Sequence, residues 1–161
     1  MTVLWHEVCG IPSRYLRLVL GNAMPWGFHN AQIADFMTAR GLRAGDRVAY
    51  IGNALSAAWV ELDGAHIVAF VPTRVTHNDA EWGRPLQYSF EQTDTFWHDG
   101  PEAQGRVLSA FRQAGARWVV ADEVPKWADT SAWNVAGVTG NLREGDFNST
   151  YYRRLDTTPD E

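Results

Sequence analysis

Three short apolar runs divide the middle of the chain, and each is typical of a strand buried on both faces. They span residues 47–51, 66–71 and 117–121. Parallel strands covered by helices on both sides show such continuous runs instead of polar alternation. Between the first two runs, apolar residues recur every three to four positions, which predicts a helix over 54–64 with one buried face. A strand, a helix and a strand within so few residues predict a right-handed parallel unit.

Helical spacing also flanks these runs. A helix is predicted over 101–114, because Pro101 suits a first turn and apolar residues follow at helical intervals. An earlier helix is predicted from Asn30, which can cap its start, to Gly41, which suits the left-handed position just past a helix end. The run WNVAGVTG and the alternating run 147–155 predict a terminal antiparallel pair, with 147–155 at one edge of the sheet.

Together these elements predict an α/β fold: a small open, mostly parallel sheet with Rossmann-like layers and a terminal antiparallel strand. Short crossovers favour neighbouring strands, so the expected order places 47–51 between 66–71 and 117–121. The 161 residues fit one domain over 29–156, with a lead-in segment over 1–28 and a frayed tail over 157–161. The first residues lack the pattern of a secretory leader, and no apolar run approaches the ~20 residues of a membrane span. A soluble chain is therefore expected, either free-standing or attached to something larger.

Composition removes several function classes. The net charge of −5 argues against non-specific nucleic-acid binding, which needs a basic surface. Cys9 is the single cysteine, so neither an internal disulfide nor a multi-cysteine metal site is possible. The five histidines show no metal-like spacing, and no metal or other cofactor is expected.

The glycines around the first apolar run argue against a nucleotide site. Gly41 and Gly45 precede the run, whereas a dinucleotide fingerprint needs its glycines between the strand and the following helix. Only Gly52 lies there. The sequence therefore predicts turns and caps at these positions, without a phosphate-binding loop.

The ends of the first and third runs form the first candidate site. Ligands of open parallel sheets bind at the carboxyl ends of the strands, where strand order reverses. Gly52 and Asn53 would face Asp122 and Glu123 there, which predicts a polar crevice for a small ligand. In the alternative, Asn53 only caps the next helix and the two acidic residues are solvated.

A second candidate lies in residues 72–98, a stretch with no clear periodicity. Connections of this length inside a compact domain are often functional. Its clustered aromatic residues could form a platform for a sugar ring or a docking surface, or could fold back over the sheet as a lid. The eight tryptophans of the whole chain have two similar interpretations: they fill the core, or they form an exposed binding surface. The aromatic cluster consists of Trp82, Tyr88, Phe90, Phe96 and Trp97.

Two family resemblances follow from these motifs. Residues 33–72 resemble the early part of acyl-adenylate-forming enzymes, which share a helix, Gly-x-x-x-Gly-Asp-Arg-Val-Ala, a strand and an asparagine. The Ser/Thr/Gly-rich phosphate loop of that family is absent, because Pro125-Lys126 is followed by Trp127 and preceded by no glycines. We interpret this resemblance as shared local architecture.

The second resemblance covers residues 30–155. The chain resembles the soluble C-terminal α/β domain of large bacterial polytopic membrane proteins of the glycosyltransferase kind. The shared features are GLRAGDRVAYIGN, a helix, a strand ending in proline, a loop with Phe-Trp, a helix of the VLSAFRQAGARWVVAD type and a terminal Tyr-Tyr hairpin. This resemblance implies a position on the periplasmic side, with a membrane protein or a lipid-linked sugar as partner. Without it, a cytoplasmic location is expected.

These observations favour a non-catalytic accessory or interaction domain associated with a bacterial membrane protein. The alternative is a small ligand-binding or enzymatic α/β domain that uses the crevice at Asn53 and Asp122. An enzyme should have a deep polar pocket at the strand ends, whereas a docking domain should have a flat aromatic surface.

Overall fold

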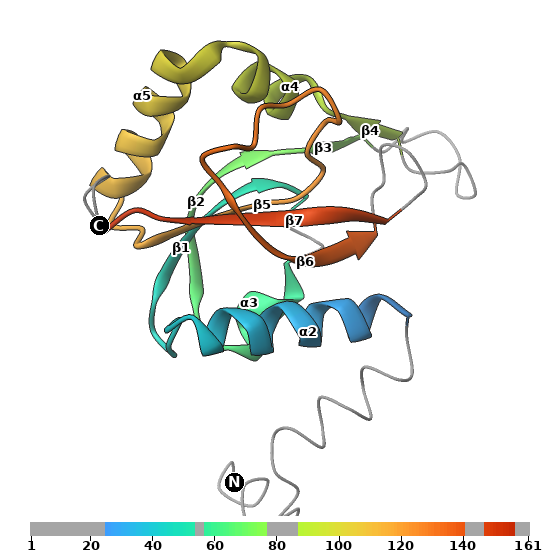
Figure 1. Cartoon of the computed structure of the whole chain (residues 1–161), viewed down its shortest axis with the longest axis vertical. Coiled ribbons are helices and arrows are strands. Elements are labelled where there is room, and N and C mark those ends of the chain that lie inside the picture. Colours follow the sequence, from blue (N-terminus) through green and yellow to red (C-terminus); the bar gives the residue numbers. More distant parts are fainter. Residues whose placement is uncertain (1–24, 54–56, 77–86, 141–146, 157–161) are drawn as a thin grey trace, which may run out of the picture.

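The main sheet of the protein is open, mixed and five-stranded, with helices on both faces (Figure 1). The computed structural model describes residues 25–53, 57–76, 87–140 and 147–156. From one edge to the other, the strands are β2 (His66–Pro72), β1 (Arg47–Gly52), β5 (Trp118–Ala121), β7 (Phe147–Arg154) and β6 (Asn134–Gly140). The helices described are α2 (Pro25–Ala39), α3 (Ala58–Leu62), α4 (Glu91–His98) and α5 (Gly100–Gln113).

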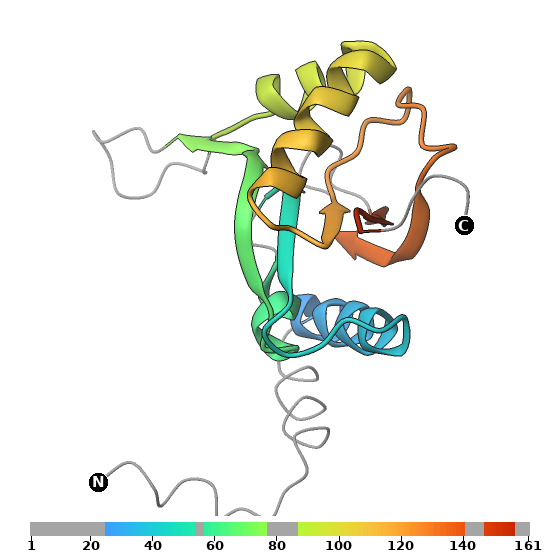
Figure 2. The ribbon, with the colours of Figure 1, turned by 90° about the vertical axis from the view of Figure 1, so that its left-hand side faces the viewer.

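The three predicted parallel strands lie side by side and form one half of the sheet. β1 pairs in parallel with β2 on one side and with β5 on the other, which confirms the expected order. Tyr50 of β1 packs towards α2 and α3, whereas its neighbour Ile51 packs towards α4 and α5. Both side chains are fully buried because helices cover both faces (Figure 2), which explains the unbroken apolar run.

The helix before β1 is longer than predicted. α2 begins at Pro25, which is tolerated in a first turn because the nitrogens there lack intrahelical partners. Asn30 therefore lies inside the helix and does not cap it. Its side-chain oxygen accepts a hydrogen bond from the backbone nitrogen of Trp59, 3.1 Å away, and so ties α2 to α3. Gly41 has a φ of +99°, as the predicted left-handed helix end requires.

Residues 72–98 are more regular than predicted. After β2, the chain forms an antiparallel hairpin of β3 (Arg74–Thr76) and β4 (Gln87–Ser89), which makes a separate two-stranded sheet, and then α4. Strands of three residues are too short to show a period in the sequence. In α4, the buried side chains are only Thr93, Phe96 and Trp97, so its helical signal is equally short.

The last two strands form the predicted antiparallel pair, but the last strand is not at the edge of the sheet. β7 pairs antiparallel with β5 on one side and with β6 on the other, so the edge of the sheet is β6. Tyr152 of β7 is buried against the α2 side, where its ring meets that of Phe36 edge to face with centroids 5.7 Å apart. The sheet is therefore mixed and only partly parallel.

Four of the eight tryptophans fill the core. Trp59 and Trp118 lie in the hydrophobic cluster beneath α2 and α3, and Trp97 and Trp133 lie in the cluster beneath α4 and α5. A buried indole ring removes a large apolar area from water, so each contributes strongly to stability. Trp127, which is 57% exposed, is the exception among the tryptophans whose burial is described.

Candidate functional site

The carboxyl ends of β1 and β5 meet at the point where the connections change face. From β1 the chain crosses through α3 to β2, and from β2 it returns through α4 and α5, on the opposite face, to β5. This is the switch point at which open α/β sheets bind ligands. The structure brings Gly52, Asn53, Asp122 and Glu123 together there, as predicted, and all four are buried. Their role in ligand binding stays a prediction.

Asp122 is the centre of a hydrogen-bond network at this point. The Tyr50 hydroxyl donates to its Oδ2 at 2.8 Å, and the backbone nitrogen of Asn53 donates to its Oδ1 at 2.9 Å. Both carboxylate oxygens thus have donors from the fold itself. Burial raises the pKa of Asp122 to about 8, with Glu123 adding to the rise, while the two hydrogen bonds oppose it. Burial of the phenol, together with the nearby Asp122 carboxyl, raises the pKa of Tyr50.

Gly52 leaves the space that Asp122 occupies. Its φ of +129° is a conformation that glycine adopts at little cost. A β-carbon at position 52 would overlap Oδ1 of Asp122 and would lie 2.9 Å from the Asp122 carbonyl oxygen. In the sequence, Gly52 is the one glycine on the correct side of the strand for a phosphate loop. In the structure, Gly52 instead contacts the side chain of Asp122.

Glu123 is the second acidic residue of the site. It has a φ of +53°, the one positive φ among the non-glycine residues that the structure describes, and its side chain is 1% exposed. Such a conformation costs about 1–3 kcal/mol and persists only where the surroundings impose it. Asp122 is also 1% exposed, so the alternative in which both acidic residues are solvated is wrong.

Titration of Asp122 should make the protein less stable as the pH rises. The folded state holds a proton up to about pH 8, whereas the unfolded chain releases it near the ordinary aspartate pKa of 3.8. Between these values stability falls with rising pH, by at most about 1.4 kcal/mol per pH unit. Asp122→Asn, which resembles the protonated acid, should flatten the fall. Urea unfolding at pH 5, 6, 7 and 8 measures both proteins.

The exposed Asp129 supplies the control for this prediction. Its pKa is lowered because its carboxylate accepts a hydrogen bond from the backbone nitrogen of Ser131, so its titration lies below the pH range used. Asp129→Asn should therefore keep the wild-type slope. If Asp122→Asn showed the same dependence of the free energy of unfolding on pH as the wild type, the assignment to Asp122 would be contradicted.

The aromatic cluster divides between core and surface. Phe96 and Trp97 are 5% and 4% exposed, and their rings meet edge to face with centroids 5.0 Å apart. Trp97 also contacts the ring of Trp133 at 5.3 Å. The interpretation of Phe96 and Trp97 as an open docking platform is thus wrong, because they cover the sheet as the lid alternative expected. Phe90 is half-buried just before α4.

Two residues of the aromatic cluster have no side-chain description. Trp82 lies outside the described residues, and Tyr88 lies in β4 with its side chain outside the described part of the structure. Sequence analysis missed Phe70 and Trp127, which at 57% are the most exposed large apolar side chains among the described residues. Phe70 sits in an apolar run that predicts burial. Trp127 follows Pro125-Lys126 outside any periodic segment, which was the available signal.

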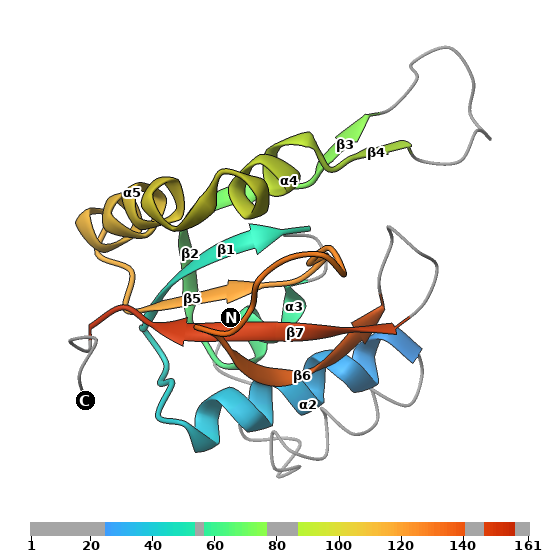
Figure 3. The same cartoon turned by 45° about the horizontal axis from the view of Figure 1, so that its top comes forward.

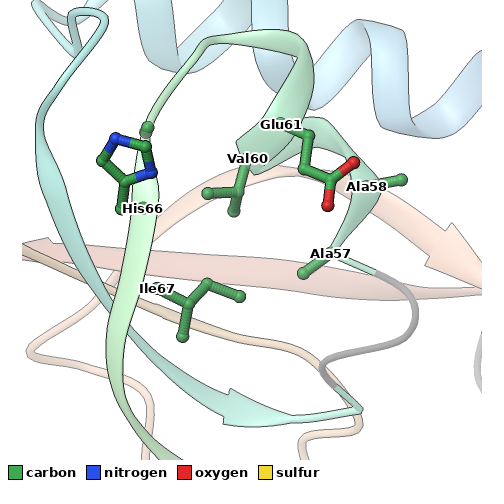
Figure 4. A pocket seen from close by; sticks show the side chains of 7 residues that line it. Ala57, Ala58, Val60, Glu61, His66 and Ile67 are labelled. Carbon is green, nitrogen blue, oxygen red and sulfur yellow. The ribbon is translucent and has the colours of Figure 1, made fainter.

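Two surface hollows away from the switch point are lined by described residues. The first, of 490 Å³, is lined by small and apolar residues of α3 and β2, with Glu61 and His66 on either side of Val60 (Figure 4). The second, of 510 Å³, follows α5. Neither is lined by the four switch-point residues. In the described part of the chain, no three His, Cys, Asp or Glu side chains are grouped as metal ligands would be.

Comparisons with known proteins identify no relative. No family model matches the chain, and neither the curated proteins nor the solved structures contain a significant match. Among the helices described, none has the length and apolar character needed to cross a membrane.

Proposed function

We propose that this chain is a non-catalytic accessory domain that acts by binding a partner protein. The observation that carries the proposal is the closed network at the switch point. Both carboxylate oxygens of Asp122 accept hydrogen bonds from the fold, and Asp122 fills the space that Gly52 leaves open. The position at which α/β enzymes hold their substrates is used here to join β1 to β5.

The β3–β4 hairpin is the surface that we assign to the partner. It pairs only with itself among the described strands and projects beyond the main sheet and α4 (Figure 3). A two-stranded hairpin is marginally stable alone, so contact with a second protein would stabilise it. Phe70, near the end of β2 and four residues before the hairpin, adds an exposed aromatic ring to the same region.

A bacterial membrane protein is the partner that this proposal favours. The support is the resemblance of residues 30–155 to soluble domains carried by polytopic membrane proteins. An attached or associated domain of this kind needs a protein-binding surface and no chemistry of its own.

Photo-crosslinking tests the proposal. Benzoylphenylalanine would replace Phe70, next to the hairpin, or Val135 on β6, at the opposite edge of the sheet. These side chains are 57% and 52% exposed, so Val135 is a matched control. The probe at position 70 should crosslink to a membrane protein in native membranes, and the probe at position 135 should not. Equal crosslinking from both positions, or none from position 70, contradicts the proposal.

A second candidate is a ligand-binding or enzymatic role for the switch point. One observation favours it: Asp122 and Glu123 are adjacent buried acidic residues, and a carboxyl group with a pKa of about 8 can donate a proton at neutral pH. NMR titration with a library of small metabolites separates the candidates. Shift changes centred on Tyr50, Asn53 and Asp122 would favour the second.

A further inference from the structure

The groove of 510 Å³ along α5 has the features of a ligand site. The helix residues that line it recur at helical spacing, from Pro101 through Gly105 and Ser109 to Arg112. The eleven steps from Pro101 to Arg112, at a rise of 1.5 Å each, make this stripe about 17 Å long. The facing wall consists of the segment around Asp129 and of β7, so the groove lies between elements that are distant in the sequence.

The groove has an apolar base and a polar rim. Trp97, Leu108 and Trp133 line the base, and all three are buried. Other lining residues carry hydroxyl, amide or charged groups: Gln104, Ser109, Arg112, Asp129, Ser131 and Arg153. Ligand pockets of a few hundred Å³ combine these two surfaces, because apolar area contributes affinity and a few polar groups orient the ligand.

The two arginines that line the groove, Arg112 and Arg153, form no ion pair with a described residue, unlike two arginines nearby. Arg117 and Arg154 both pair with Asp156. Arg112 donates its Nε to the carbonyl of Leu155 at 2.8 Å, which orients the guanidinium group while leaving its terminal nitrogens for another acceptor. The side chain of Arg153 makes no hydrogen bond or ion pair within the part of the chain that the structure describes. A guanidinium group in this state suits an anionic ligand.

Gly105 is an independent indication. It lies in the middle of α5, where glycine is among the poorest helix formers. No described atom lies within 4 Å of the position its β-carbon would take, so packing against the described residues does not require glycine there. The missing side chain opens the helix backbone to whatever occupies the groove, which is a recognised use of glycine.

We propose that this groove binds a sugar that carries an anionic group. The arginines match a carboxylate or a phosphate, and the hydroxyl and amide side chains both donate and accept, as sugar hydroxyls require. Asp129 can accept from sugar hydroxyls, which an acidic peptide lacks. The apolar base can contact the C–H face of a sugar ring. The site shares no residue with the hairpin, so it extends beyond the proposed function and stands independently of it.

Isothermal titration tests the proposal with four probes: trigalacturonate, glucose 6-phosphate, neutral maltotriose and hexaglutamate. At least one of the two anionic sugars should bind roughly ten times more tightly than maltotriose and hexaglutamate. The tighter of the two identifies the anion as carboxylate or phosphate. Arg153→Gln should weaken that sugar about tenfold, as expected for a lost charge-assisted hydrogen bond.

Two variants on α5 complete the experiment. Arg106 is exposed, pairs with Glu102 and does not line the groove, so Arg106→Gln should leave binding unchanged. Gly105→Ala should weaken binding without lowering the unfolding midpoint, which separates loss of space from loss of folding. The proposal is overturned if neither anionic sugar binds, if hexaglutamate binds as well as they do, or if Arg106→Gln weakens binding as much as Arg153→Gln.

Discussion

Gly52→Ala is expected to lower the free energy of unfolding by about 2–6 kcal/mol, the sum of a strained backbone and an overpacked site. The φ of +129° at this position is one that alanine rarely adopts. Its β-carbon would also overlap Oδ1 of Asp122, which accepts the hydrogen bond from the backbone of Asn53. Because Asp122 must move, the hydrogen bond from the Asn53 backbone to Asp122, which connects the ends of β1 and β5, should be lost as well. Urea unfolding measures the change.

Gly105→Ala is the matched control for this prediction. Nothing described lies near the added methyl group, and the position is inside α5. Alanine is favoured over glycine in a helix interior by about 1 kcal/mol, so this variant should be more stable than the wild type. If Gly52→Ala changed stability as little as Gly105→Ala, Asp122 and the backbone at position 52 would adjust freely. The close contact between Gly52 and Asp122 would then not be a constraint on the fold.

Trp97→Ala is expected to cost about 3–5 kcal/mol of stability, as is usual for a large buried side chain. Trp97 is 4% exposed and contacts the rings of Phe96 and Trp133. Its indole nitrogen is buried and has no hydrogen-bond partner among the described groups, so the loss comes from apolar area and ring contacts. The free energy of unfolding in urea is again the measurement.

Trp127→Ala provides the comparison with an exposed tryptophan. At 57% exposure, Trp127 contacts the ring of His98 at 6.1 Å and should change stability by no more than about 0.5 kcal/mol when truncated. If Trp97→Ala were as mild as Trp127→Ala, the ring would not be part of the core. The docking interpretation of residues 72–98 would then regain its support.

Much of the parallel unit was predictable from sequence because its signals are local. Strands buried on both faces read as unbroken apolar runs, and short crossovers favour neighbouring strands, so β1 was placed between β2 and β5. The meeting of Asn53 and Asp122 followed from the same reasoning, since carboxyl ends of adjacent parallel strands share one edge. This prediction required only the pairing of adjacent parallel strands, and no contact between segments distant in the sheet.

The sequence by itself thus determined the parallel strands, the residues that meet at their ends and the helices other than α4. Only the tertiary structure decided what those residues do. The burial of Asp122, the covering of Trp97 and the place of β7 inside the sheet all depend on contacts with segments distant in the chain. An aspartate that follows a strand has the same local pattern whether it faces water or Tyr50. The burial and the pKa of Asp122 depend on all the residues that pack around it, and the pattern of its neighbours in the sequence does not reveal that packing.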